Sequence, residues 1–291
     1  MINTSTLAQA EGPSLSLNRL IWRRFVRHRL ALIGVAFITL ITLAAVFAPL
    51  LTRYDPEEQD LFSIAQPPDA AHVLGTDELG RDLLTRLFYG GRISLAVGVV
   101  SAAISTAIGV LVGAIAGYYG GWFDYALMRL VDLLLAFPSI FLLLILFASI
   151  RASLWTVILF LGAFGWFYLA RVVRGEFLAL REKEFVEASK ALGTNSLRLI
   201  LRHLLPNVTG SIIVATTLAI AFNMLSEGTL SFLGYGVPAS TPTWGNMLNA
   251  AQSMYTQAPL LTVAPGVMLT LAVLAVNFIG DGLRDALDPR A

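Results

Sequence analysis

The chain has 291 residues, of which 56% are hydrophobic and 13% are charged, and its net charge is +1. Because a soluble domain carries about 25% charged residues, this composition predicts a polytopic membrane protein. The sequence contains no cysteine, which excludes disulfides and cysteine nucleophiles, and its three histidines are too scattered to predict a metal site.

The chain begins with a polar tail, residues 1–29, which ends in several arginines. The uncharged run that follows, residues 30–51, is longer than the apolar core of a signal peptide, and no small-residue cleavage site follows it. We therefore expect a first transmembrane helix over residues 30–51 rather than a cleaved signal. The preceding arginines place the N-terminus in the cytoplasm.

The loop of residues 52–92 carries eight acidic residues against four arginines, and is expected outside the cytoplasm. Its second half, LGTDELGRDLLTRLFYGGRISL, resembles the LGTD-x-x-GRD segment of the peptide and nickel branch of ABC importers. The residues that match this pattern are Asp77, Gly80, Arg81, Asp82, Arg86, Gly90, Arg92 and Ser94. Without that resemblance, the simpler interpretation is an amphipathic surface helix held by salt bridges.

Five further helices are predicted in the core, residues 93–280, over 93–118, 125–150, 154–170, 208–232 and 260–279. In the first of them, Gly109, Gly113 and Gly117 recur every four residues. This spacing predicts close packing, either against another helix of this chain or against a second subunit. The expected fold is all-α with six transmembrane helices, which leaves the tail, residues 281–291, in the cytoplasm.

A few polar residues and one proline within these helices are candidates for the translocation path or its gate: Asp132, Pro138, Asn223 and Glu227. Ionisable groups within a bilayer are costly and are usually functional. The alternative for Asp132 is a pair with Arg129, one helical turn away. Partners between helices are the alternative for Glu227. The proline should kink its helix because it lacks a backbone N–H.

A charged loop, residues 171–207, lies between two of the apolar runs and carries seven basic residues against four acidic ones. The basic surplus predicts a cytoplasmic position, and counting helices from an inside N-terminus gives the same result. The loop divides at Gly193 into two short helical patterns. Their apolar positions are Phe185, Ala188 and Leu192 in the first and Leu197, Ile200, Leu201 and Leu204 in the second.

The turn residues of this loop agree with a helix, a sharp turn and a second helix. Gly193 suits a left-handed helix end, Thr194 or Asn195 suits the cap of the next helix, and Pro206 suits its end. An apolar ridge flanked by charges in a mostly hydrophobic chain indicates a docking surface for a soluble protein.

The order Glu187-Ala188-Ser189, then Gly193, then Leu205-Pro206 resembles the EAA loop of ABC importer membrane subunits. In that family the loop carries a coupling helix that sits in a groove of the ATPase subunit. The residues that the resemblance assigns to ATPase coupling are Glu187, Ala188, Ser189, Gly193, Leu197, Leu201, His203, Leu205 and Pro206. His203 stands where the family often has isoleucine. Without the full pattern, Glu187 would be interpreted as a surface residue paired with Lys183 or Lys190.

The resemblance extends from Arg19 to Arg290 and implies the type I ABC importer membrane-domain fold. It implies a permease subunit that imports di- or oligopeptides across a bacterial inner membrane, with nickel or glutathione import as alternatives on the same architecture. The implied partners are a second homologous permease, two ATPase subunits that bind ATP and Mg, an extracytoplasmic peptide-binding protein and the lipid bilayer. We expect no catalytic residue, metal, cofactor or nucleic acid in this chain, and it lacks the G-x-x-x-x-G-K-[ST] phosphate loop.

Two other classes of protein are alternatives to a permease. An ion-coupled secondary transporter would use Asp132 and Glu227 as carriers, but such proteins usually show inverted repeats, and the charged loop would then have no role. An intramembrane enzyme needs an activated nucleophile or a carboxylate pair, and no signature of such chemistry accompanies these two residues.

Overall fold

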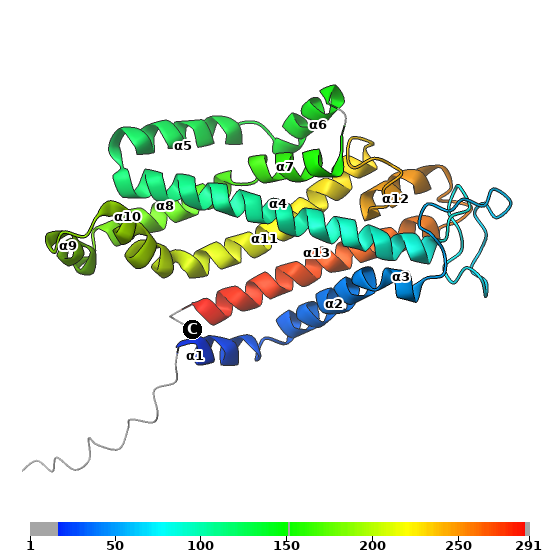
Figure 1. The fold of residues 1–291 in the computed structure, drawn as a ribbon, viewed down its shortest axis with the longest axis horizontal. Helices are drawn as coiled ribbons and strands as arrows, with labels where there is room; N and C mark the ends of the chain where they lie inside the picture. Colours follow the sequence, from blue (N-terminus) through cyan, green and yellow to red (C-terminus); the bar gives the residue numbers. More distant parts are fainter. Residues whose placement is uncertain (1–16, 151, 289–291) are drawn as a thin grey trace, which may run out of the picture.

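The computed structural model describes residues 17–150 and 152–288. The sequence-based expectations for residues 1–16, for Arg151 and for the last three residues lie outside the described part. The described residues form an elongated bundle whose helices run along its length (Figure 1), and they contain helices and loops but no strand beyond one isolated bridge.

Five helical stretches are long and apolar enough to cross a membrane, and six if the bent pair α5 and α6 counts as one span. In this sense the all-α, six-span prediction is confirmed for the described residues. The spans are α2 (Arg29–Val46), α4 (Leu83–Tyr119), α5 with α6 (Gly121–Leu135 and Ser139–Ser149), α7 with α8 (Leu154–Phe164 and Phe167–Arg181), α10 to α11 (Ser196–Leu199 and Leu205–Phe232) and α13 (Leu260–Leu287).

Several helix limits differ from the predicted ones. The first helix ends at Val46 and is followed by a separate turn, α3 (Ala48–Leu51). The second begins at Leu83 rather than Ile93, because the carboxylate of Asp82 caps it by accepting a 2.8 Å hydrogen bond from the N–H of Thr85. The helices predicted to end at residues 170 and 279 continue to Arg181 and Leu287. Much of the charged loop is therefore helical.

The predicted kink at Pro138 is confirmed, and it is a complete break. α5 and α6 meet at 78°, and Pro138 is the N-cap of α6 with extended backbone. A proline has no N–H to continue the helix, so the chain turns there instead of bending smoothly.

The glycines of α4 pack within this chain. A Cβ added to Gly113 would lie 2.6 Å from the carbonyl oxygen of Ala170, and one added to Gly117 would lie 2.6 Å from the Cβ of Phe177. Only hydrogen side chains allow α4 and α8 to approach this closely. Of the two predicted uses of the spacing, the structure shows packing against a helix of the same chain.

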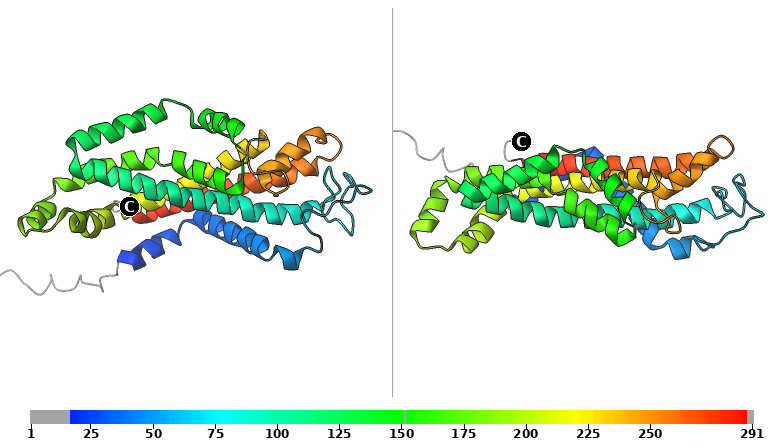
Figure 2. Two further views of the ribbon diagram at one scale, coloured as in Figure 1. Left: turned by 45° about the horizontal axis from the view of Figure 1, so that its top comes forward. Right: turned by 90° about the horizontal axis from the view of Figure 1, so that it is seen from above.

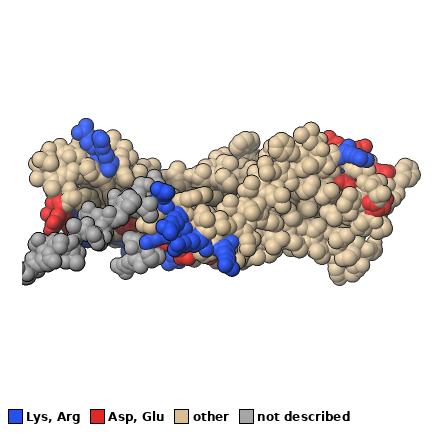
Figure 3. Space-filling model, turned by 90° about the horizontal axis from the view of Figure 1, so that it is seen from below, with Lys and Arg blue, Asp and Glu red and all other residues tan. Residues whose placement is uncertain are grey.

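The bundle has two chemically different ends. We call them the α9 end, with α1 (Leu17–Phe25), α9 (Glu184–Ala191) and the end of α13, and the cap end, with residues 52–82 and α12 (Trp244–Ala250). The views of Figure 2 show the long helices joining these ends. Figure 3 shows charged side chains gathered at both ends and an uncharged surface between them, as the apolar core of a bilayer requires.

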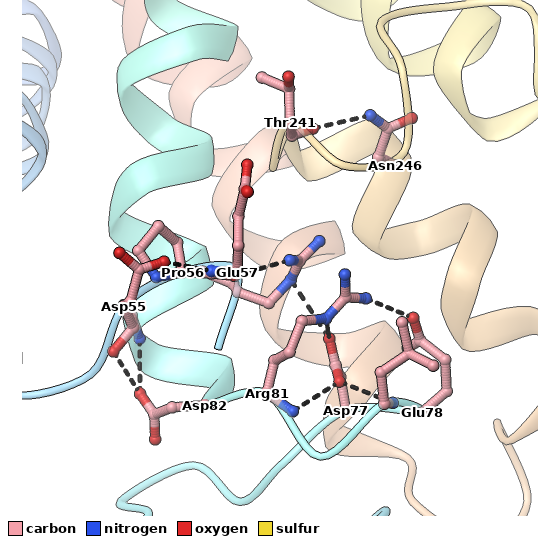
Figure 4. Close-up of polar contacts among 12 residues, drawn as sticks. Asp55, Pro56, Glu57, Asp77, Glu78, Arg81, Asp82, Thr241 and Asn246 are labelled. Atoms are coloured by element: carbon pink, nitrogen blue, oxygen red, sulfur yellow. Dashed lines mark hydrogen bonds and ion pairs between the residues drawn. The ribbon is translucent and has the colours of Figure 1, made fainter. Parts of the chain in front are cut away.

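The LGTD segment forms a buried clamp at the cap end (Figure 4). Nε of Arg81 lies 2.7 Å from Oδ2 of Asp77, and Nη2 of Arg81 lies 2.6 Å from Oε1 of Glu78. Nε of Arg86 lies 3.3 Å from the same oxygen of Asp77, and Nη1 donates to the carbonyl oxygen of Pro56 at 2.9 Å. The ion pairs of the alternative interpretation are present. However, Asp77, Arg81 and Arg86 are buried, so the segment is not a surface helix.

Candidate functional site

The charged loop folds as a helical hairpin, residues 182–204, at the α9 end. Gly193 ends α9 with φ at +79°, and its N–H donates to the carbonyl oxygen of Lys190 at 2.9 Å. The side chain of Asn195 caps α10 by accepting from the N–H of Arg198 at 2.9 Å. The predicted helix, turn and helix are therefore present, and Asn195 rather than Thr194 is the cap.

The inner face of the hairpin is anchored to three long helices. Val186 and Leu199 are fully buried in a cluster with Phe177 of α8 and Val208 of α11. Nζ of Lys190 lies 6.0 Å from the ring centre of Tyr118, at the end of α4. These contacts attach the hairpin to the ends of α4, α8 and α11.

The outer face of the hairpin is apolar and exposed. Leu192 is 87% exposed, Leu197 66%, Leu201 55% and Phe185 43%. Unlike the exposed apolar side chains of the spans, these lie among exposed charged residues of the hairpin, and an exposed apolar patch with a polar rim marks an interaction site. Glu187 lies on α9 close to this face, and no ion pair joins it to Lys183 or Lys190 within the part of the chain that the structure describes.

The residues expected to couple to an ATPase do not all lie on this outer face. The exposed ones are Glu187, Ala188, Gly193, Leu197, Leu201 and Pro206. Ser189 is buried, and its hydroxyl donates to that of Thr194 at 3.1 Å. His203 and Leu205 are half-buried. These last three support the hairpin from within.

The prediction that Pro206 ends the second helix is wrong. A π turn, residues 200–204, joins α10 to α11, and Pro206 lies in the first turn of α11. Proline is tolerated in the first turn of a helix, and here the π turn that precedes it already interrupts the regular hydrogen-bond pattern. The result is one helical stretch, Ser196–Phe232, of 37 residues, which at about 1.5 Å per residue is roughly 55 Å long. This stretch connects the hairpin to the centre of the bundle.

A cavity of ≈460 Å³ opens beside α11, between α4, the α5–α6 break and the α7–α8 break. Pro138 and Asn223, two of the predicted path residues, line it. No charged side chain does; its walls include Phe137, Phe164, Phe167, Tyr168, Phe222, Ser105, Thr106 and Ser139. Nδ2 of Asn223 is buried without a hydrogen-bond partner among the described residues. The cavity is thus an aromatic chamber with a few polar groups.

A second cavity, of ≈510 Å³, continues from the first towards the α9 end and shares Tyr168, Ala215 and Leu218 with it. It is more polar, because Glu176, Ser211 and Arg284 contribute to its lining. The hydroxyl of Ser211 donates to the carboxylate of Glu176. Sequence reasoning missed these residues. A signal was present in the small residues Gly210, Ser211 and Ala215, whose spacing places them on one side of α11.

Asp132 lies outside both cavities. Its carboxylate pairs with Arg171 of α8, and the expected pair with Arg129 is not formed; the guanidinium of Arg129 instead lies 5.5 Å from the ring centre of Tyr125. A second ion pair joins Asp124 to Arg174 between the same two helices. Both pairs tie α5 to α8.

Glu227 is fully buried near the cap end and lines neither cavity. Its carboxylate accepts hydrogen bonds from the hydroxyls of Ser94 at 3.2 Å and Ser231 at 2.8 Å. The hydroxyl of Ser94 in turn accepts from the N–H of Trp244 at 3.2 Å. Of the two environments expected for Glu227, the structure shows partners between helices, which join α4, α11 and α12.

Comparison with known proteins agrees with this geometry. Residues 109–291 match the family described as binding-protein-dependent transport system inner membrane component. The chain belongs to this family, whose members are the membrane-spanning permeases of ABC importers. Residues 16–68 also match the N-terminal TM domain of oligopeptide transport permease C.

Individual relatives cover nearly the whole chain. It is 40% identical over 99% of its length to the oligopeptide transport system permease protein OppC of Bacillus subtilis, covering 94% of that protein. It is 45% identical over 92% of its length to a putative peptide permease protein of Brucella suis, covering 89% of that protein. It is 41% identical over 92% of its length to the glutathione transport system permease protein GsiD of Escherichia coli, again covering 89%.

A solved structure shares the fold. The MetNI methionine ABC transporter, in an inward-facing conformation, aligns with a TM-score of 0.56 and 22% sequence identity. The alignment covers 69% of this chain and 96% of the matched chain. The type I importer fold expected from the sequence is therefore confirmed.

Proposed function

We propose that this chain is one membrane-spanning half of an ATP-driven importer of di- and oligopeptides. It works with a second homologous permease, two ATPase subunits that bind ATP and Mg, and an extracytoplasmic peptide-binding protein. The observation that carries the proposal is the continuous helical stretch of residues 196–232, which begins in the exposed hairpin and passes Asn223 in the cavity wall.

The hairpin is the docking element for an ATPase subunit. Its outer face offers Leu192, Leu197 and Leu201 to a complementary apolar groove, the usual mode of helix-in-groove recognition. Its inner face is held by Val186 and Leu199, so a force applied to the outer face is transmitted to α8 and α11 instead of deforming the turn.

Transport follows from the movement of the hairpin. Closure of the ATPase dimer displaces the hairpin, and α11 carries this displacement past both cavities towards the cap end. Because packed helices move as rigid bodies between discrete arrangements, the bundle alternates between inward and outward openings. This chain supplies the lever and the path, and its partners supply ATP hydrolysis.

The chamber beside α11 suits a peptide. Passage of a solute that varies in side chain requires a roomy path with weak, general contacts, and uncharged aromatic walls with scattered hydroxyls supply these. The names of two relatives favour peptides over nickel, and the third relative carries glutathione, itself a peptide. Glutathione import remains the second candidate on the same architecture.

The basic α9 end belongs in the cytoplasm and the cap end outside the cell membrane of a bacterium, with both termini inside. The surplus of basic residues in the charged loop, residues 171–207, supports this orientation by the positive-inside rule. It also directs the cap towards the binding protein and the hairpin towards the ATPases.

The test is a reconstitution of the chain with its candidate partner permease and ATPases in liposomes. We expect the double variant Leu197→Asp, Leu201→Asp to lose both peptide-stimulated ATP hydrolysis and uptake of a labelled peptide, because two buried carboxylates would oppose docking. The control is Phe62→Asp, which alters a 99% exposed apolar residue at the cap end, away from the hairpin, and should retain the basal ATP hydrolysis of the assembled complex. Uptake that persists without ATP and follows a proton gradient would instead support an ion-coupled transporter.

A further inference from the structure

The short helix α1, which precedes the first span, has one face packed on the bundle. Phe25 is buried in a cluster with Ala286 of α13, and Ile21 and Leu283 pack against that cluster. Nη1 of Arg24 donates to the carbonyl oxygen of Asp288 at 2.8 Å. These contacts fix the rotation of α1, so its opposite face has a defined direction.

That opposite face carries two parallel rows of exposed side chains. Arg19 and Arg23 of α1 and Arg27 of the turn that follows it recur at intervals of four residues and form the first row. Trp22 of α1, 66% exposed, and Val26 of the following turn, 40% exposed, form the second row. None of the ion pairs in the described part of the chain involves these three arginines. The face therefore combines positive charge with an apolar edge.

The position of α1 places this face at the boundary between lipid and water. α1 ends at Phe25, and the membrane-spanning helix α2 begins at Arg29. The first turns of α2 expose Leu30 (48%) and Ile33 (61%), which continue the apolar edge into the bilayer. Figure 3 shows basic side chains gathered at this end, next to the uncharged middle of the molecule.

We propose that α1 is an interfacial anchor that binds anionic phospholipid headgroups of the leaflet at the α9 end. Tryptophan is enriched at the level of the headgroups, and guanidinium groups bind phosphate oxygens through paired, charge-assisted hydrogen bonds. Trp22 and Val26 enter the headgroup layer, and the arginine row contacts the phosphates. An amphipathic helix rich in arginine on its polar side binds a membrane surface in this manner.

The absence of cysteine from the sequence permits a direct measurement of depth. Val26→Cys carries a nitroxide in the assembled complex, in nanodiscs of either phosphatidylcholine or a phosphatidylglycerol mixture. We expect the nitroxide at position 26 to collide more often with oxygen than with a water-soluble nickel chelate. This excess of oxygen collisions should be greater in the anionic nanodiscs than in phosphatidylcholine. The same label in Phe62→Cys at the cap end should contact the chelate in both.

The arginine row is tested by charge removal. The triple variant Arg19→Gln, Arg23→Gln, Arg27→Gln should abolish the increase in the excess of oxygen collisions that anionic nanodiscs produce. Salt at ~1 M, where the screening length is about 3 Å, should have the same effect. The control Arg53→Gln, Arg129→Gln, which removes exposed positive charge outside α1 and outside the hairpin, should retain the increase. Protection of the label from both reagents would show that a protein partner covers α1. Equal depth in both lipids, or free access of the chelate, would equally overturn the proposal.

Discussion

The N–H of Leu205 donates its hydrogen bond to the carbonyl oxygen of Ile200, five residues back instead of four. This π turn lies immediately before Pro206, where the hairpin passes into α11. Such turns are frequent at functional sites. We expect Pro206→Ala to restore an N–H, let the helix become regular and slow hydrogen exchange over residues 200–206. If the turn serves as a compliant joint, uptake per ATP hydrolysed should fall.

The matched control for this change is Pro259→Ala, at the N-cap of α13 near the cap end. It also restores an N–H at the start of a long helix, but no π turn precedes it. Unchanged uptake per ATP in Pro206→Ala, despite slower exchange, would show that the turn has no part in coupling.

Gly193 is required for its backbone conformation and not for space. Its φ is +79°, and a Cβ added there would meet nothing within 4 Å. We expect Gly193→Val to distort the turn and abolish ATPase coupling, and Gly193→Asn to retain most of it, because asparagine tolerates this conformation. Gly175→Val in α8 is the control, since a Cβ there also meets nothing and φ is not positive. Equal losses in both valine variants would contradict this explanation.

The chamber beside α11 predicts a dependence on solute size. Ala219 lines it, and Ala107, on the exposed side of α4, does not. Ala219→Phe should reduce uptake of longer peptides more than that of dipeptides, with ATPase binding unchanged, because the added ring occupies part of ≈460 Å³. Ala107→Phe should leave uptake unaltered. A uniform loss for all peptide lengths would indicate general damage to the bundle.

Most of the fold could be predicted from the sequence because its signals are local. Long apolar runs define the spans, and Gly193 and Asn195 define the turn and cap of the hairpin. The limits of the helices were less accessible. Asp82 begins α4 ten residues before the apolar run, because a side-chain cap and not hydropathy decides where the helix starts.

The candidate path was harder to predict because it depends on pairing between distant segments. Spacing within one helix suggested Arg129 as the partner of Asp132, but the tertiary fold supplies Arg171 from α8. Pro138 and Asn223 share a cavity only because α5 breaks beside α11. Glu227, the most polar position of its helix, is fully hydrogen-bonded at the cap end, which hydropathy alone does not reveal.

The two ion pairs between α5 and α8 both join an arginine to an aspartate, so their coupling energies can be compared at different exposure. In the pair of Arg171 with Asp132 the side chains are 48% and 50% exposed, and in that of Arg174 with Asp124 they are 33% and 18% exposed. Arg174 also donates from Nη2 to Oδ2 of Asp124 at 2.7 Å. Double-mutant cycles with Gln and Asn, read by thermal unfolding, should give about 0–1 kcal/mol for the exposed pair and a larger coupling for the other. The reverse order would contradict this ranking.

Two variants of Glu227 distinguish a structural role of its carboxylate from a role as a proton carrier. Glu227→Gln keeps one acceptor for Ser231 and offers an amide N–H to the hydroxyl of Ser94, so we expect ATP-driven uptake and thermal stability close to those of the unaltered protein. Glu227→Leu leaves both hydroxyls without this acceptor, at about 1–3 kcal/mol for each buried unsatisfied group, and should lower the unfolding temperature. Loss of uptake in Glu227→Gln at unchanged stability would instead assign the carboxylate a direct part in transport, because only its charge and proton would then have been removed.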